Sequence, residues 1–356
     1  MKSVLRLQIS ASKAIVGLLL AGALGATVVA QATQINGAGA TFPFPIYSKW
    51  FSEYNKKFPN VEINYQSIGS GGGIRQFVQG TVDFGATDGP MSEIQLAAVK
   101  GNVVHLPTVL GAVVLSYNLP SLGAGRLKLN APLIADIFLG KITRWDHPRI
   151  AALNPGLTLP KTDLIVVHRS DGSGTTFVFV DYLSKVSPEW RSRVGSATSV
   201  SWPTGLGGKG NEGVTQQIKQ LEGSIGYVEL VYALSNQLPV VLVRNSAGQF
   251  VEPSLEAVTA AAAGTKLGKD TDFRVSITDA VGPKSYPIAS YTWLLVKADT
   301  PDAAKGKVLR DFLAWMLTPE AQQMANALGY APLPGDVAAL VRERLKTLKA
   351  GGKPLA

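Results

Sequence analysis

The stretch HRSDGSGTT, residues 168–176, lies between the apolar run LIVV (164–167) and the helix-like segment FVFVDYL (177–183). This pattern predicts a β-strand that passes through a polar turn into an α-helix. The nine residues carry one guanidinium group, one carboxylate, four hydroxyls and two glycines. A connecting loop does not need that much hydrogen-bonding capacity, so the stretch is a candidate ligand-binding turn.

Two other turns rich in glycine and hydroxyls also precede helix-like sequence: GAGATF at 37–42 and GSGGG at 69–73. A helix N-terminus binds anions because its first N–H groups lack intrahelical partners and carry a partial positive charge. Glycine lets the backbone approach a ligand closely, and Ser and Thr add hydroxyl donors. One such turn is usually only a capped helix. Three turns in one chain, one of them beside Arg169, indicate a site for a small oxyanion.

Outside these turns, strand-like and helix-like segments alternate, which favours an α/β fold. Strands are expected at 61–65, 82–86, 103–117 with breaks at Pro107 and Gly111, 164–167, 240–243 and 291–296. Helices are expected from Gly73 onward, at 92–100, 131–139, 175–184, 212–221 and 254–263, and over most of 302–348.

The N-terminus has the pattern of a cleavable signal peptide, residues 1–32. Residues 1–13 carry three basic residues and no acidic one, residues 14–30 are apolar, and Ala30-Gln31-Ala32 fits a signal-peptidase site. The mature chain is therefore expected to start near Thr33 and to be exported to the periplasm; a retained N-terminal anchor is the alternative. With no cysteine in the sequence, neither disulfides nor a lipid-bearing cysteine can be invoked.

The net charge gives no sign of a nucleic-acid partner. Of the nine excess positive charges, three lie in the leader, so the rest of the chain carries +6 without a block of Lys and Arg.

Two nucleotide-binding motifs and one esterase motif fit poorly. GLGGKG at 205–210, with Glu229 about 19 residues further on, matches G-x-G-x-x-G, but WPT at 202–204 stands where a central strand should precede it. Lys209 is followed by glycine rather than Ser or Thr, so a Walker A motif is absent. Ser70 and Ser173 do not fit G-x-S-x-G, because Ile68 and Asp171 replace the first glycine.

No metal site or acid–base pair is indicated. His105, His147 and His168 are the only histidines and have no ligand spacing. His168 could add charge beside Arg169, but strand alternation favours the opposite face for it. Asp83 and Asp88 bracket a strand without an evident acid–base role. No metal and no cofactor are therefore expected.

Four motifs in order resemble the periplasmic phosphate-binding proteins of bacterial high-affinity phosphate ABC transporters. They are GAGATFP at 37–43, IGSGGG at 68–73, VDFGATD at 82–88 and RSDGSGT at 169–175. Further similarity at 139–142, 153–157, 202–211 and 226–229 extends the resemblance over essentially the whole mature chain.

The resemblance implies a two-lobed periplasmic-binding-protein fold of α/β type, with the ligand in a cleft between the lobes. The first lobe would comprise 33–112 and 290–356, and the second 113–289. The chain would act as a monomeric, non-enzymatic receptor that delivers phosphate to the permease subunits and ATPase of an inner-membrane importer.

The resemblance also assigns phosphate contacts to matching positions. Eight residues would bind the ligand: Thr41, Phe42, Ser70, Asp88, Arg169, Ser173, Gly174 and Thr175. Asp171 would orient Arg169. The chain departs from the family's common residues at Ser170, His168 and Thr87, none of which is an assigned contact.

Asp88 has a physical purpose in such a site. A carboxylate beside an anion is repulsive unless the ligand brings a proton. Phosphate retains an O–H near neutral pH, its second pKa being about 6–7, whereas sulfate has none. The mismatch in a desolvated site is expected to cost sulfate several kcal/mol, and phosphate binding should persist from mildly acidic to mildly alkaline pH.

Three alternatives stay open from the residues. A receptor for sulfate, molybdate or tungstate would use the same donors. A secreted phosphatase would need a nucleophile and a base, and Ser173 has no assigned histidine to activate it. A surface-exposed adhesive role of the same architecture is the third.

Overall fold

The computed structural model describes residues 32–123, 125–265, 267–268 and 272–355. The predicted signal peptide, apart from Ala32, lies outside these residues. Residues 32–356 form one compact unit. Among the helices that the structure describes, none has the length and apolar character required to cross a bilayer.

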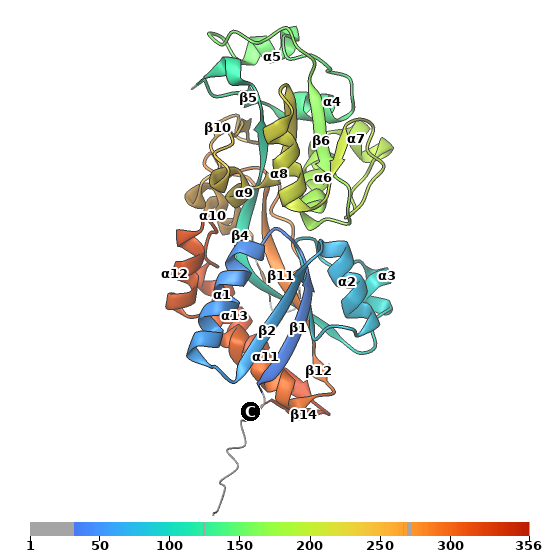
Figure 1. The fold of residues 1–356 in the computed structure, drawn as a ribbon, viewed down its shortest axis with the longest axis vertical. Helices are drawn as coiled ribbons and strands as arrows, with labels where there is room; N and C mark the ends of the chain where they lie inside the picture. The colour runs from blue at the N-terminus through green and yellow to red at the C-terminus, as the bar shows by residue number, and fades with distance from the viewer. Residues whose placement is uncertain (1–31, 124, 266, 269–271, 356) are drawn as a thin grey trace, which may run out of the picture. The chain divides into compact units, whose positions relative to one another are not determined.

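An eight-stranded mixed sheet runs through the molecule (Figure 1). In spatial order its strands are β2 (Val61–Ser67), β1 (Thr33–Gly39), β3 (Phe84–Thr87), β11 (Ala289–Lys297), β4 (Val103–Tyr117), β8 (Ser224–Glu229), β6 (Ile165–Arg169) and β7 (Leu206–Gly208). Two three-stranded sheets accompany it: β10 (Phe250–Val251), β9 (Leu242–Arg244) and β5 (Lys128–Leu129), and β12 (Asp299–Thr300), β13 (Lys349–Ala350) and β14 (Lys353–Pro354).

Strand β4 joins the two halves of this sheet. Its first part, up to Ala112, pairs antiparallel with β11, and from Val113 onward it pairs antiparallel with β8. The strand is continuous over all 15 residues and Gly111 pairs with Ser290, so the expected breaks at Pro107 and Gly111 are both wrong. A register shift between Thr292 and Trp293 accommodates the proline, which has no N–H to donate to the ladder.

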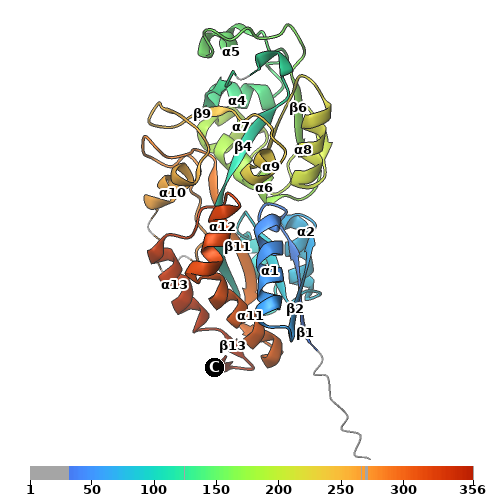
Figure 2. The ribbon, with the colours of Figure 1, turned by 60° about the vertical axis from the view of Figure 1, so that its left-hand side comes forward.

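The helices pack on both halves of the sheet. They are α1 (Phe44–Lys57), α2 (Ser70–Gln79), α3 (Glu93–Ala97), α4 (Ala131–Phe138), α5 (Pro148–Leu153), α6 (Gly174–Val186), α7 (Pro188–Arg193), α8 (Gly210–Gln220), α9 (Leu230–Ser235), α10 (Leu255–Ala263), α11 (Ala303–Met316), α12 (Pro319–Ala327) and α13 (Gly335–Leu345), with a 3₁₀ turn at Pro120–Leu122. Helices α1 and α2 contact β1–β3, whereas α6 and α8 contact β6 and β8. The C-terminal α11 and α12 return to β1 and α1 (Figures 1 and 2).

The alternation of strands and helices is confirmed as a mixed α/β fold, with two further local corrections. Helix α2 begins at Ser70 rather than at Gly73, so most of the expected turn at 69–73 is helical. Residues 37–39, expected in a turn, belong to strand β1, and the helix that follows begins only at Phe44, after Pro43. Position 37 of this strand has room only for glycine, because a Cβ there would lie 2.1 Å from the Phe84 ring on the neighbouring strand. The turn itself is thereby shortened to residues 40–43.

Candidate ligand-binding site

The three polar turns meet because of the strand directions. Strands β1 and β3 are parallel to each other, and β6 runs opposite to them through the antiparallel pairs of β11, β4 and β8. The carboxyl ends of β1 and β3 therefore approach the carboxyl end of β6 from opposite directions (Figure 1). The carboxyl ends of strands are where open α/β sheets bind ligands.

All of the expected contact residues come to this meeting point. Thr41 and Phe42 follow β1, Ser70 begins α2, and Asp88 follows β3. Arg169 ends β6, Ser173 is the N-cap of α6, and Gly174 and Thr175 are its first residues. None of the six polar side chains is more than 3% exposed. The site is therefore desolvated, which strengthens every electrostatic contact within it.

Arg169 is held by Asp171. Its Nε and Nη2 donate to Asp171 Oδ1 (2.8 Å) and Oδ2 (2.5 Å), and its Nη1 donates to Thr175 Oγ1 (3.3 Å). Burial raises the pKa of Asp171, but the hydrogen bonds and charge of Arg169 outweigh it and hold that pKa below its usual range. The Asp171 carboxylate is therefore charged near neutral pH, and it holds the guanidinium in one orientation.

Four hydroxyl oxygens in the site already accept hydrogen bonds from N–H groups. The Oγ1 of Thr41 accepts from Asn211, Ser70 Oγ from the Asp88 N–H (3.3 Å), Ser173 Oγ from the Thr176 N–H (3.0 Å), and Thr175 Oγ1 from Asn211 and Arg169. Within the described residues, the hydroxyls of Thr41, Ser173 and Thr175 donate to no acceptor, whereas the Ser70 hydroxyl faces the Asp88 carboxylate and lowers its pKa through a hydrogen bond. The hydroxyls of Thr41, Ser173 and Thr175 are therefore available as donors to a ligand.

Asp88 differs from the hydroxyl residues of the site because its carboxylate can only accept hydrogen bonds when it is ionised. Its Oδ1 accepts from the Thr292 hydroxyl (2.8 Å), whereas its buried Oδ2 has no hydrogen-bond partner among the described residues. Burial raises the pKa of Asp88 to about 7, against the hydrogen bond of Thr292, the charge of Arg169 and the hydroxyl of Ser70. A buried carboxylate oxygen without a hydrogen-bond donor destabilises the protein. A ligand that donates a hydrogen bond to this oxygen would remove that cost.

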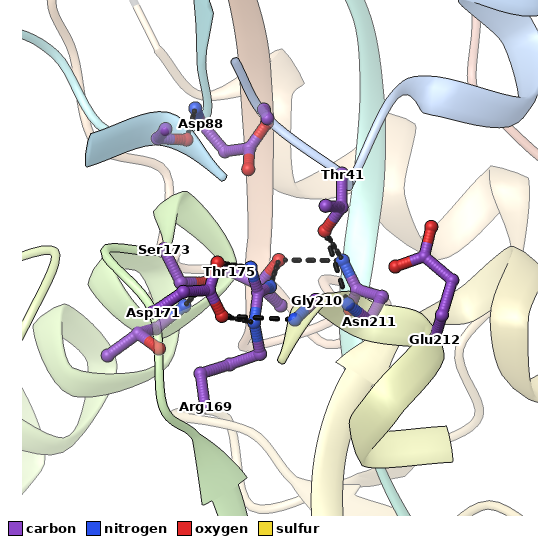
Figure 3. A network of polar contacts seen from close by, with 12 residues as sticks. Thr41, Asp88, Arg169, Asp171, Ser173, Thr175, Gly210, Asn211 and Glu212 are labelled. Atoms are coloured by element: carbon purple, nitrogen blue, oxygen red, sulfur yellow. Dashed lines mark hydrogen bonds and ion pairs between the residues drawn. The ribbon is translucent and has the colours of Figure 1, made fainter. Parts of the chain in front are cut away.

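Close approach of the backbone completes the enclosure. A Cβ on Gly174 would lie 2.4 Å from both Asp88 Oδ2 and Ser70 Oγ. The N–H of Gly71 donates to the carbonyl of Gly172 (2.8 Å), so the α2 turn and the α6 turn touch directly. Figure 3 shows the polar side chains gathered around this point.

Three side chains in the network were not expected from the sequence. Asn211, the second residue of α8, donates to both Thr41 and Thr175. Tyr232 donates to the Thr41 carbonyl (2.6 Å), and Thr292 donates to Asp88. Only Asn211 had a local signal, because it directly follows the glycine-rich run 205–210 at the start of a helix.

That glycine-rich run does not form a dinucleotide fold. Residues 206–208 are the edge strand β7 itself, rather than a turn after a central strand. The run ends at the N-terminus of α8, where the Gly210 N–H donates to Asp171 Oδ1 (3.0 Å).

The histidines and Asp83 have structural contacts. His168 stacks on Trp202 at 4.8 Å, and burial lowers its pKa, so it adds no charge beside Arg169. The other three groups are likewise engaged: His105 with Asp272, His147 as the N-cap of α5, and Asp83 with Lys305. Among the described residues, no group of three or more His, Asp or Glu is placed to hold a metal ion.

Comparison with known proteins agrees with this architecture. The family model of the PBP superfamily domain matches residues 25–320. The phosphate-binding protein PstS of Haemophilus influenzae is 47% identical over 326 residues, which cover 91% of this chain and 96% of that protein. The PstS of Xylella fastidiosa is 48% identical over 304 residues, covering 85% and 82%.

A solved phosphate-binding protein from Stenotrophomonas maltophilia shares the fold, with a TM-score of 0.69 at 20% identity and coverage of 87% of this chain and 93% of that one. The sequence matches to PstS proteins are far stronger and extend over most of both chains. The chain therefore belongs to the PBP superfamily and, within it, to the family of the PstS phosphate-binding proteins.

Proposed function

We propose that this chain is a receptor for inorganic phosphate, bound where the turns after β1, β3 and β6 meet. One observation carries the proposal: a buried set of donors surrounds a single carboxylate oxygen, Asp88 Oδ2, that has no donor of its own among the described residues. The names of the PstS relatives support the same ligand.

The donor side suits a tetrahedral oxyanion. Arg169 supplies the charge. The N–H groups of Ser70 and Gly72 at the start of α2, and of Gly174 and Thr175 at the start of α6, have no intrahelical acceptor because they lie in the first turn. The N–H of Phe42 belongs to the peptide whose carbonyl, on Thr41, accepts from Tyr232, and this bond polarises the peptide toward donation. With the hydroxyls of Thr41, Ser173 and Thr175, these groups supply donors from opposite sides of the ligand.

The acceptor side selects among oxyanions. An anion that carries an O–H can donate to Asp88 Oδ2, whereas sulfate would place a lone pair against it. Asp88, Arg169, Ser70, Ser173, Gly174 and Thr175, with Thr41 and Phe42, would thus bind phosphate, and Asp171 would orient Arg169.

The wider role follows from the family. We propose a non-enzymatic, monomeric periplasmic receptor, exported by the leader and cleaved near Ala32, that delivers phosphate to the permease and ATPase of an ABC importer. The lobes would be 33–112 with 290–356, and 113–289, because β4 changes its pairing partner between Ala112 and Val113. Release of p-nitrophenol from its phosphate ester, abolished by a site substitution, would favour the phosphatase alternative instead.

Titration calorimetry on protein stripped of endogenous phosphate tests the ligand and its selection. We expect tight phosphate binding at pH 8 and sulfate binding weaker by at least about 100-fold, since an unmatched buried acceptor costs about 1–3 kcal/mol or more. Asp88→Asn should narrow that ratio by improving sulfate, because the amide supplies a donor where the carboxylate supplied only lone pairs.

Asp83→Asn is the matched control, because Asp83 bracketed the same strand in the sequence but pairs with Lys305 away from the site. It should leave the phosphate-to-sulfate ratio unchanged. Comparable affinities for both anions in the unmodified protein would overturn the proposed ligand. An unchanged ratio in Asp88→Asn would overturn the role of Asp88 alone.

A further inference from the structure

Asn211 is a fully buried side chain that bonds to both sides of the site (Figure 3). Its Oδ1 accepts from the backbone N–H of Glu229 (2.9 Å), which can only donate. The orientation of the amide is thereby set, and Nδ2 faces the two threonines. Each Nδ2 hydrogen is used once, toward Thr41 Oγ1 at 2.8 Å and toward Thr175 Oγ1 at 3.1 Å.

The two threonine oxygens have no acceptor capacity left. A hydroxyl oxygen has two lone pairs. Thr41 Oγ1 accepts from Nδ2 and also from the backbone N–H of Asn211 (3.2 Å), and Thr175 Oγ1 accepts from Nδ2 and from Arg169 Nη1 (3.3 Å). Nitrogen donors cannot accept in return. Each hydroxyl can therefore form one further hydrogen bond, and only as a donor.

The start of α8 also donates a hydrogen bond to Asp171, the carboxylate that holds Arg169. The residue before Asn211, Gly210, donates its N–H to Asp171 Oδ1 (3.0 Å), and Asp171 in turn holds Arg169. Thr41 follows β1, whereas Thr175 and Arg169 belong to the β6–α6 segment. One helix terminus thus contacts the donors contributed by both sides.

We propose that Asn211 is a positioning residue of the phosphate site: by filling the acceptor positions of Thr41 and Thr175, it commits both hydroxyls to donate to the ligand. It is not itself a ligand contact, since both of its amide hydrogens are engaged. The inference rests on the proposed function. It adds that the Asn211 amide determines the direction of the hydrogen bonds from Thr41 and Thr175 to the ligand.

Two substitutions, one that keeps the shape of the side chain and one that truncates it, separate orientation from packing. Asn211→Asp keeps the acceptor for Glu229 but, when ionised, accepts from the threonine hydroxyls and turns their hydrogens away from the ligand. Asn211→Ala leaves both hydroxyls free to rotate. We expect the phosphate Kd by calorimetry at pH 8 to rise at least about tenfold in Asn211→Ala and at least about 100-fold in Asn211→Asp.

The pH dependence of Kd distinguishes a positioning role from a purely structural one, because a purely structural role of Asn211 would leave that dependence unchanged. The Kd ratio of Asn211→Asp to the unmodified protein should fall toward pH 5, as the new carboxylate gains a proton and can donate again. The ratio for Asn211→Ala should stay flat. Asn154→Ala is the matched control: Asn154 is also a buried asparagine, held by Lys128 and Ile150, and its loss should lower stability without changing Kd.

A double-mutant cycle keeps the test valid if an Asn211 variant folds poorly. Thr41→Ser retains the hydroxyl and should bind nearly as the unmodified protein does, whereas Thr41→Val should lose at least about fivefold. In the Thr41→Val background, Asn211→Ala should cost clearly less than it does alone.

The outcomes are distinguishable. If the unmodified protein fails to bind phosphate, the proposed function falls. If it binds but both Asn211 variants stay within about threefold of it, or if the two substitutions are additive, the positioning role falls and the function stands.

Discussion

At the scale of single residues, the site depends on how closely the backbone at Gly174 approaches the groups opposite. A Cβ there would meet both Asp88 Oδ2 and Ser70 Oγ at 2.4 Å. Real Cβ atoms do not come that near other atoms, so the α6 turn or the β3 turn would have to move. Glycine is required at this position because Asp88 and Ser70 occupy the space that a Cβ would need, and not because of an unusual backbone angle.

Gly174→Ala should therefore weaken phosphate binding while the protein stays folded. Overpacking of this kind costs about 1–3 kcal/mol, which corresponds to a factor of about 10 to 100 in Kd by calorimetry. Gly264→Ala serves as the control, because a Cβ at Gly264 meets nothing within 4 Å. Equal affinities in the two variants would show that the α6 turn does not approach Asp88 in solution.

At the scale of elements, the junction between β8 and α9 contains a second buried carboxyl group. Glu229 ends β8 and is the N-cap of α9, where its Oε2 accepts from the Val231 N–H (2.8 Å). Its Oε1 is buried without a partner among the described residues, and burial raises the pKa of this side chain well above its usual range. Burial therefore disfavours the charged form of this side chain.

Glu229→Gln should preserve the fold and should stabilise it at alkaline pH. The amide keeps the cap acceptor and carries no charge to desolvate. In the unmodified protein, by contrast, the stability due to the raised pKa is present at acid pH and is lost as pH rises. Urea denaturation should show equal stabilities below the ordinary pKa of a glutamic acid, 4.5, and an advantage for the glutamine variant that grows as pH rises above it. Glu229→Ala, which removes the cap, should lose about 1 kcal/mol or more relative to the glutamine variant at every pH.

The elements show where local sequence is sufficient and where it is not. Helix α6 and strand β6 were predictable because apolar periodicity and the polar turn agree, and α10 and α4 were predictable for similar reasons. Strand β1 was not, because its glycines carry a turn signal locally and only the Phe84 ring across the sheet favours them. The continuity of β4 past Pro107 was also unpredictable, since it depends on how β4 pairs with the distant β11, where Thr292 and Trp293 pair with Val109 and Pro107.

The candidate site followed the same division. Motif resemblance identified the groups on the three turns, each next to an element boundary. Asn211, Tyr232 and Thr292 act through contacts 170, 191 and 204 residues away in sequence. No local pattern encodes such pairings, so only the assembled fold brings them to light.

At the scale of the whole molecule, the raised pKa of Asp88 links the stability of the folded chain to pH. The carboxyl ordinarily titrates near pH 4, and burial raises its pKa to about 7 in the folded protein. Between these values the folded chain holds a proton that the unfolded chain has lost. The resulting stability is therefore present below about pH 4 and disappears as pH rises through 7.

In phosphate-free buffer, the unfolding free energy of the unmodified protein should fall relative to that of Asp88→Asn as pH increases from 4 to 8. The slope should approach about 1.4 kcal/mol per pH unit and total about 4 kcal/mol. Denaturation curves at four or five pH values, taken for both proteins, measure this difference and cancel the contribution of Glu229. Parallel pH profiles would mean that Asp88 is solvated in the ligand-free protein.

The contact between Gly71 and Gly172 has a kinetic consequence. We expect an anion bound among these side chains, which are at most 3% exposed, to depart only after that backbone hydrogen bond and the bonds from Asn211 to Thr41 have broken. Its residence time then depends on how often the two sides separate as well as on the strength of its own contacts. A substitution far from the anion that hastens this separation would shorten the residence time without removing a single ligand contact.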